Sequence, residues 1–273
     1  MRVAGLVIGI ALASLPTQFG LAKVRHSKPS AHAAAASYRL PATGDLSAAD
    51  LARFADQAIE APADQFSAPF DATPVVGRSF RIAIPIESYG PLKWSYDRST
   101  GSLNISVEGD RLLAINFLQV RSAAPESARR WEQWSQPPHA LLVDSRNLGR
   151  EQKEEQNAFG AKVAVTTLRG RHVYIAEFGD VDGGSLTAPI NVTLPMAPDV
   201  ARAASASLKL EAQGIVVDPD HGHSLRCGGY YDEPTVANPY EMWGDNCVYA
   251  VKINRFDIVD GAGRSYWHWS RAP

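Results

Sequence analysis

The densest group of potential metal ligands is residues 218–223, which read Asp-Pro-Asp-His-Gly-His. Carboxylate oxygens and imidazole nitrogens bind zinc and other divalent metals, and the two histidines share a face where the backbone is extended. The sequence therefore predicts a candidate metal site. The alternative is a polar turn without metal, because Asp-Pro and His-Gly are common turn sequences. The candidate ligands are Asp218, Asp220, His221 and His223, with Asp232, Glu233 and Asp245 as further ones.

A second acidic segment, residues 179–185 (GDVDGGS), resembles part of a calcium-binding loop. The D-x-D-G spacing is present, but the distal glutamate that completes such a loop is absent. A turn between two strands is therefore the better interpretation of this segment.

Aromatic residues gather in the C-terminal part of the chain. Exposed aromatic rings on a rigid β scaffold stack on sugars or anchor protein partners, whereas buried rings fill a core. We predict that several rings around residues 230–243 are exposed as one patch and bind a partner. The candidate binding residues are Tyr230, Tyr231, Tyr240 and Trp243.

The sequence contains no motif for nucleophilic catalysis, nucleotide binding or nucleic-acid binding. It has no G-x-S-x-G nucleophile turn, and neither a P-loop nor a G-x-G-x-x-G dinucleotide motif. The net charge is −2 and the pI is about 6.4, without the basic stripe typical of nucleic-acid binders. We therefore expect no cofactor other than a divalent metal, and no nucleic-acid partner.

The two cysteines, Cys227 and Cys247, are 20 positions apart. In an oxidising compartment such a pair predicts a disulfide, which would contribute about 3 kcal/mol by closing the loop. The alternative is a metal-binding thiol pair.

The N-terminus has the layout of a secretory signal peptide over residues 1–22. Arg2 precedes the apolar run 3–15, and Gly20 and Ala22 stand at the −3 and −1 positions before Lys23. The alternative, an uncleaved anchor, is disfavoured because a spanning helix needs roughly 20 apolar residues. We expect a periplasmic or secreted protein without a transmembrane span after signal removal.

Hydrophobic periodicity predicts the elements of the N-terminal half. Residues 45–60 form a helix with a capping box at Ser47 and Asp50. Alternating apolar residues then predict a four-stranded antiparallel meander over 79–121, with Pro85 at an edge or a strand end. A short helix is expected at 125–134, and a polar loop or short exposed helix at 146–157.

In the C-terminal half, strands 162–168 and 172–178 flank Arg169-Gly170 as a predicted hairpin. A strand over 190–196 and a helix over 198–206 follow. Two long strands are expected at 207–217, where Gly214 shifts the alternation, and at 248–259. A change of phase predicts a β-bulge between Asn254 and Phe256.

The predicted fold is mainly β, with antiparallel sheets in a sandwich-like arrangement and two or three short peripheral helices. The expected organisation is a signal peptide (1–22), a flexible leader (23–40), a helix plus β-meander (41–121), a connector (122–138) and a C-terminal β region (139–273). That last region contains a disulfide-closed loop over 218–246.

Three functions compete on this sequence. The first is a non-catalytic binding or structural protein of the cell envelope, with an envelope protein or a glycan as partner. The second is a metal-dependent hydrolase or metal-binding protein that uses residues 218–223. The third is a purely architectural protein without a small-molecule site.

Overall fold

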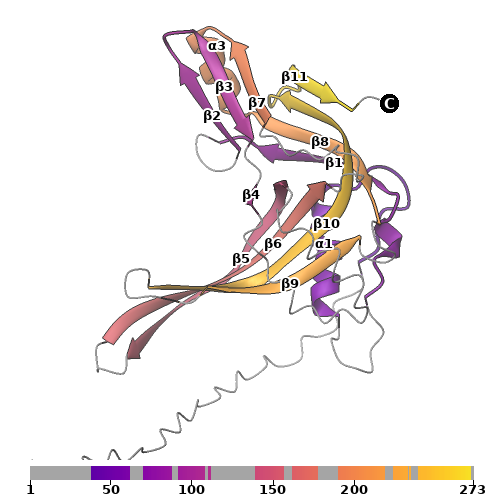
Figure 1. The fold of residues 1–273 in the computed structure, drawn as a ribbon, viewed down its shortest axis with the longest axis vertical. Coiled ribbons are helices and arrows are strands. Elements are labelled where there is room, and N and C mark those ends of the chain that lie inside the picture. Colours follow the sequence, from indigo (N-terminus) through magenta and orange to yellow (C-terminus); the bar gives the residue numbers. More distant parts are fainter. Residues whose placement is uncertain are drawn as a thin grey trace, which may run out of the picture. The chain divides into compact units, whose positions relative to one another are not determined.

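Two β-sheets hold most of the described residues in the computed structural model (Figure 1). The structure describes residues 38–61, 70–87, 92–107, 110–111, 139–156, 162–177, 190–218, 224–232, 234 and 239–271. The larger sheet has the order β1-β8-β10-β6-β5-β4, with β9 and β11 also paired to β10, and the smaller sheet has the order β2-β3-β7. The prediction of a mainly β protein with mostly antiparallel pairing is confirmed, and the exception is the parallel pair β6 and β10.

The strands of the larger sheet are β1 (Ser79–Pro85), β4 (Asp110–Arg111), β5 (His139–Gln156), β6 (Lys162–Glu177), β8 (Lys209–Val216), β9 (Leu225–Asp232), β10 (Tyr240–Val259) and β11 (Ser265–Ser270). The strands of the smaller sheet are β2 (Leu92–Asp97), β3 (Ser102–Val107) and β7 (Ile190–Pro195). The helices of the described residues are α1 (Ala48–Glu60), α3 (Pro198–Ser205) and the short 3₁₀ helix η1 (Thr73–Val75).

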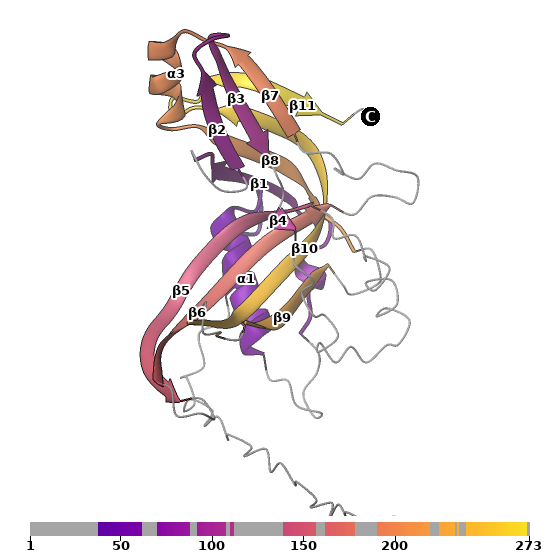
Figure 2. The same cartoon turned by 60° about the vertical axis from the view of Figure 1, so that its left-hand side comes forward.

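Strand β10 organises the larger sheet because its two halves have different neighbours (Figure 2). Its first half lies between β6 and β9, and its second half pairs with β8 and β11. Between the halves, the pairing with β8 skips Asn254. The predicted bulge is thus confirmed, centred one residue earlier than expected.

Gly214 lies opposite this bulge and allows the two backbones to approach closely. A Cβ at Gly214 would lie 2.2 Å from the carbonyl oxygen of Lys252. Burial nevertheless alternates regularly along β8 through Gly214. The phase shift predicted in β8 is therefore wrong, because the extra residue sits in β10.

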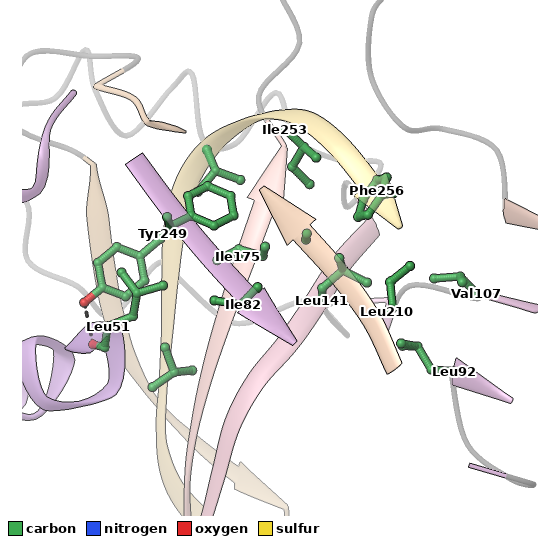
Figure 3. Packing of buried hydrophobic residues seen from close by; sticks show 14 of the residues in the cluster. Leu51, Ile82, Leu92, Val107, Leu141, Ile175, Leu210, Tyr249, Ile253 and Phe256 are labelled. Atoms are coloured by element: carbon green, nitrogen blue, oxygen red, sulfur yellow. Dashed lines mark hydrogen bonds between the residues drawn. The ribbon is translucent and has the colours of Figure 1, made fainter. Parts of the chain in front are cut away.

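Helix α1 forms where the sequence predicts it. Ser47 and Asp50 make the predicted capping box, and Leu51, Phe54 and Ala55 are buried on one face. The hydroxyl of the fully buried Tyr249 in β10 donates to the backbone oxygen of Leu51 at 2.7 Å (Figure 3). This bond and the apolar face fix α1 against the larger sheet.

One hydrophobic cluster joins α1 to residues of both sheets (Figure 3). Ile82 and Leu210 come from the larger sheet, and Leu92, Leu103 and Val107 come from the smaller one. Sandwich-like packing of the two sheets stays a prediction.

The predicted antiparallel meander over 79–121 is wrong in its first pair and also in its last, because both edges of β3 pair with other strands along its whole length. Strand β1 pairs with β8 along its whole length, whereas β2 pairs with β3, and β3 pairs with β7. Alternation of apolar residues marks each strand correctly but carries no information about its partner across 130 residues of chain. Pro85 lies at the end of an edge strand, as predicted.

The predicted polar loop or helix at 146–157 is also wrong, because residues up to Gln156 continue β5. This part of β5 has no apolar face, and most of its side chains are exposed. Its backbone instead pairs with β6, from Arg150 opposite Leu168 to Gln156 opposite Lys162. This part of β5 is therefore a strand because its backbone hydrogen-bonds to β6, although its sequence has no alternation of apolar residues.

The predicted hairpin at Arg169-Gly170 is a continuous strand, β6. Two-residue hairpin loops need positive φ angles, and Gly170 is not among the glycines with positive φ. It pairs with Gly244 on one side and with Asn147 on the other. The ladder on both sides keeps Gly170 extended.

The predicted loop over 218–246 contains strand β9 and the start of β10. The predicted disulfide is present and joins directly opposed residues of these two strands, with 4.0 Å between the Cα atoms of Cys227 and Cys247. The sequence predicted a loop here because the Gly, Pro and aromatic residues of this segment do not alternate regularly.

Several predictions fall on residues that the structure does not describe. These are the signal peptide, most of the flexible leader, the strand over 112–120 and the helix at 125–134. The domain boundaries stay predictions. Among the described residues, no helix is both long and apolar enough to cross a membrane.

Candidate functional site

The candidate site lies where β6 and β10 run parallel. Trp243 and Asp245 in β10 are two positions apart and therefore lie on one face of the sheet. Their partners in the ladder are Arg169 and Arg171 of β6, and directly opposed residues share a face. The sequences Trp-Gly-Asp and Arg-Gly-Arg thus place one aromatic ring, one carboxylate and two guanidinium groups together.

The glycines of these two triplets face each other on the opposite side of the sheet. Gly244 is the partner of Gly170, and a Cβ at Gly244 would lie 1.8 Å from the carbonyl oxygen of Gly170. No side chain larger than hydrogen fits there without moving the strands apart. The close approach at the glycines therefore fixes the register of the four site residues.

The Arg169 guanidinium lies over the indole of Trp243, 3.8 Å from the ring centroid. Such a planar cation is attracted to the negative face of the ring. Trp243 remains 36% exposed, which is a large exposure for a residue that is mostly buried in proteins. Arg169 thus holds an exposed indole in one orientation.

Asp245 is half-buried beside this ring. Burial raises the pKa of the Asp245 carboxyl, and the positive charges of Arg171 and Arg169 oppose that rise. Within the described ranges, no hydrogen bond or ion pair engages its carboxylate. Its oxygens can therefore accept hydrogen bonds from a ligand.

Arg171 does not pair with Asp245 because it is held by α1. Its Nη1 atom lies 2.6 Å from Asp56 Oδ1, and Arg146 Nη1 of β5 lies 2.7 Å from Asp56 Oδ2. Arg146 also pairs with Asp144 at 2.8 Å. This network connects the helix to the sheet and keeps two cations near the site.

A second set of charged side chains lies two positions before Trp243 in the ladder, on the same face of the sheet. Glu241 accepts a hydrogen bond from Thr167 at 2.6 Å and pairs with Lys153 at 2.8 Å. Glu155 and Glu241 together raise the pKa of Lys153. These side chains are mutually satisfied and complete the rigid surroundings of Trp243.

Two of the four aromatic residues predicted as one patch, Tyr240 and Trp243, lie on opposite faces of the sheet. Tyr240 is 43% exposed, but it lies three positions before Trp243 in an uninterrupted ladder. The two side chains therefore point to opposite faces, and a single patch cannot contain both. The backbone of Tyr231 lies opposite Trp243 and that of Tyr230 opposite Gly244, whereas their side chains lie outside the described residues.

The residues on the two sides of the predicted metal segment 218–223 both hydrogen-bond to Ala250 of β10. Val217 donates to the oxygen of Ala250, and Ala250 donates to the oxygen of Ser224, both at 2.9 Å. Asp218 is half-buried. The other predicted ligands in the segment lie outside the described residues, so the metal site stays a prediction, as does the calcium-like segment 179–185. These undescribed ligands are Asp220, His221 and His223.

The further ligands proposed for that site are separated in the fold. Asp245 belongs to the face described above, and Asp232 is at the end of β9 opposite Met242. Glu233 lies outside the described residues. In the part of the chain that the structure describes, no three His, Cys, Asp or Glu side chains are grouped as metal ligands.

Sequence reasoning missed Arg169, Arg171 and Asp56 as site residues. A usable signal exists in the matched triplets 169–171 and 243–245, each with a central glycine between larger residues. Their pairing depends on a parallel contact between strands some 74 residues apart, from Thr167 to Glu241. Local pattern does not reveal that contact.

The chain matches no known protein family, no curated protein and no solved structure. Function must therefore be inferred from the site itself.

Proposed function

We propose that this protein is an exported, non-catalytic binding protein of the cell envelope, and that its Trp243 surface binds a glycan. The Trp243 surface consists of Trp243, Arg169, Asp245 and Arg171. The observation that carries the proposal is an exposed indole beside a carboxylate that no described residue engages, both on one face of the larger sheet.

A sugar ring offers groups that complement this surface. The C–H groups of one sugar face pack on an indole, and the hydroxyls donate hydrogen bonds to a carboxylate. Arg169 already stacks on Trp243. The indole side chain therefore loses little conformational entropy when a ligand binds. The arrangement suits recognition rather than bond cleavage, since the four residues of the Trp243 surface include a single carboxylate, whereas glycoside cleavage uses a pair.

Two features support export and a rigid site. The disulfide between Cys227 and Cys247 suits an oxidising compartment, as does the predicted signal peptide. It also joins β9 to β10 two residues after Asp245. The strand that presents the site is therefore held on both edges.

A glycan panel tests the proposal. Peptidoglycan fragments, lipopolysaccharide core oligosaccharides and neutral polysaccharides are immobilised, and the purified protein is applied to them. We expect at least one member to bind, and Asp245→Asn to weaken that binding about tenfold, because a hydrogen bond to a charged group is lost. Glu154→Gln, an exposed carboxylate of β5 outside the site, serves as the matched control and leaves binding unchanged.

Failure of the whole panel would contradict the glycan proposal. Capture of envelope proteins by the same preparation, with loss of capture in Asp245→Asn, would then assign the surface to a protein partner. Binding that Asp245→Asn and Glu154→Gln reduce equally would show that the glycan contacts another part of the protein.

The pH dependence of binding follows from the raised pKa of Asp245. Above that pKa the carboxylate accepts hydroxyl donors, and protonation removes one of its acceptor oxygens. We therefore expect affinity to fall as the pH decreases, with a midpoint above the ordinary carboxyl value of 3.8. Titration of the tightest glycan at several pH values measures this effect, which Asp245→Asn should abolish. A midpoint unchanged in Asp245→Asn would assign the effect to another group.

A further inference from the structure

A hollow of about 530 Å³ lies apart from the Trp243 surface, beside the start of the described chain. Its walls come from residues 38–42, from one side of α1 and from residues 70–78. Ligand pockets in proteins span about 300–1,000 Å³, so the hollow has room for one small molecule.

The walls of the hollow are largely apolar. Phe54 of α1 packs edge-on against Phe70, with 5.1 Å between ring centroids and an interplanar angle of 66°. Leu40, Pro41 and Pro74 complete the apolar lining. These side chains favour a ligand with a hydrocarbon body.

Hydrogen bonds between the walls hold the hollow open. Arg78 Nη2 donates to the backbone oxygens of Pro41 and Gly44, at 2.9 and 3.2 Å. Gln57 Nε2 donates to the oxygen of Tyr38 at 3.1 Å, and the Tyr38 hydroxyl donates to Asp50. The segment 38–44 is thereby tied both to α1 and to the start of β1.

The charges of the lining do not cancel. Arg78 bonds to neutral carbonyl oxygens, and Arg39 is exposed without an ion pair to any described residue. The acid of the lining, Asp71, accepts the amide hydrogen of Thr73 at 2.9 Å within its own turn. Two arginines against one aspartate leave the hollow with an excess of positive charge.

We propose that this hollow binds a single-chain amphiphile with a carboxylate headgroup, such as a free fatty acid. The hydrocarbon chain lies against Phe54, Phe70 and Leu40, and the carboxylate faces Arg39 and Arg78. A guanidinium group is a preferred partner of a carboxylate because of its planar set of donors. The volume accommodates one chain and favours a free acid over a two-chain lipid. This site is independent of the proposed glycan surface.

Calorimetric titration with octanoate and octan-1-ol tests the proposal on the purified protein. Both probes carry the same hydrocarbon chain, so the difference in their affinity isolates the headgroup. We expect octanoate to bind with one site per chain and about tenfold more tightly than octan-1-ol, because charge-assisted hydrogen bonds are stronger than neutral ones.

Two variants locate the binding. Arg39→Gln should weaken octanoate about three- to fivefold without changing octan-1-ol, since an exposed charge contributes modestly. Ala42→Trp places an indole in the hollow and should abolish the binding of both probes, whereas Arg202→Gln on α3 is the matched control with unchanged affinities. We expect each variant to fold, because Arg39 and Ala42 are both exposed. Circular dichroism of each variant checks this.

Three outcomes would overturn the proposal. They are absence of octanoate binding, equal affinities for octanoate and octan-1-ol, and undiminished binding in a folded Ala42→Trp variant. None of these results affects the glycan proposal, because the lining of the hollow and the Trp243 surface have no residue in common.

Discussion

Gly244→Ala is expected to destabilise the protein by about 2 to 3 kcal/mol, as overpacking in a tight site does. The added methyl would lie 1.8 Å from the Gly170 carbonyl oxygen and 2.7 Å from its carbon. These atoms belong to the backbone of β6, so no side chain can turn away to make room. The strands must separate, and the ladder hydrogen bonds on both sides of the glycine pair weaken.

Urea unfolding followed by circular dichroism measures this effect. Gly229→Ala in β9 is the matched control, because a Cβ there would make an ordinary contact of 3.7 Å with the Gly244 oxygen. We expect the control to change the free energy of unfolding by less than about 1 kcal/mol. Equal stability of both variants would show that β6 and β10 are not held as closely as described.

Removal of the disulfide is the second large effect, with an expected loss of about 3 kcal/mol in the free energy of unfolding. Cys227 and Cys247 are directly opposed in β9 and β10. The cross-link restricts the unfolded chain, and the fully buried Cys247 also packs in the core. The double variant Cys227→Ala/Cys247→Ala loses the covalent link while keeping small apolar side chains.

Reduction of the wild-type protein provides the control for the cysteine variant. Dithiothreitol should lower the unfolding midpoint of the wild-type protein toward that of the double variant, and it should not affect the double variant itself. A wild-type midpoint that does not respond to complete reduction would contradict a stabilising role of this cross-link.

Local pattern predicted the elements whose burial follows a regular period. The capping residues Ser47 and Asp50 mark the start of α1, and the alternation of Phe80 and Ile82 marks β1. The cysteine pair was predicted from compartment and count alone. In each of these cases the relevant physics acts within a few neighbouring residues or follows from composition.

Pairing over long distances was not predictable in the same way. The pairing of β1 with β8 and of β6 with β10 depends on which strands fit together in three dimensions. The polar end of β5 becomes a strand because β6 provides its hydrogen-bonding partner. The local sequence of β5 does not indicate that β6 is its partner.

The candidate site shows the same limit. Trp243 was predicted as a binding residue from its type, but Tyr240 was grouped with it although the strand geometry separates the two faces. Arg169 and Asp56 were missed because they reach the site from another strand and from α1. Their role depends on contacts between distant segments.

The most direct test of the glycan surface compares two exposed aromatic residues of the same strand. The dissociation constant of the tightest glycan from the panel is measured for Trp243→Ala and for Tyr240→Ala. We predict a loss of affinity of about 30-fold or more for Trp243→Ala, as for a central aromatic contact, and an unchanged affinity for Tyr240→Ala. Equal effects of the two substitutions, or full affinity in Trp243→Ala, would contradict the proposal that the Trp243 face binds the glycan.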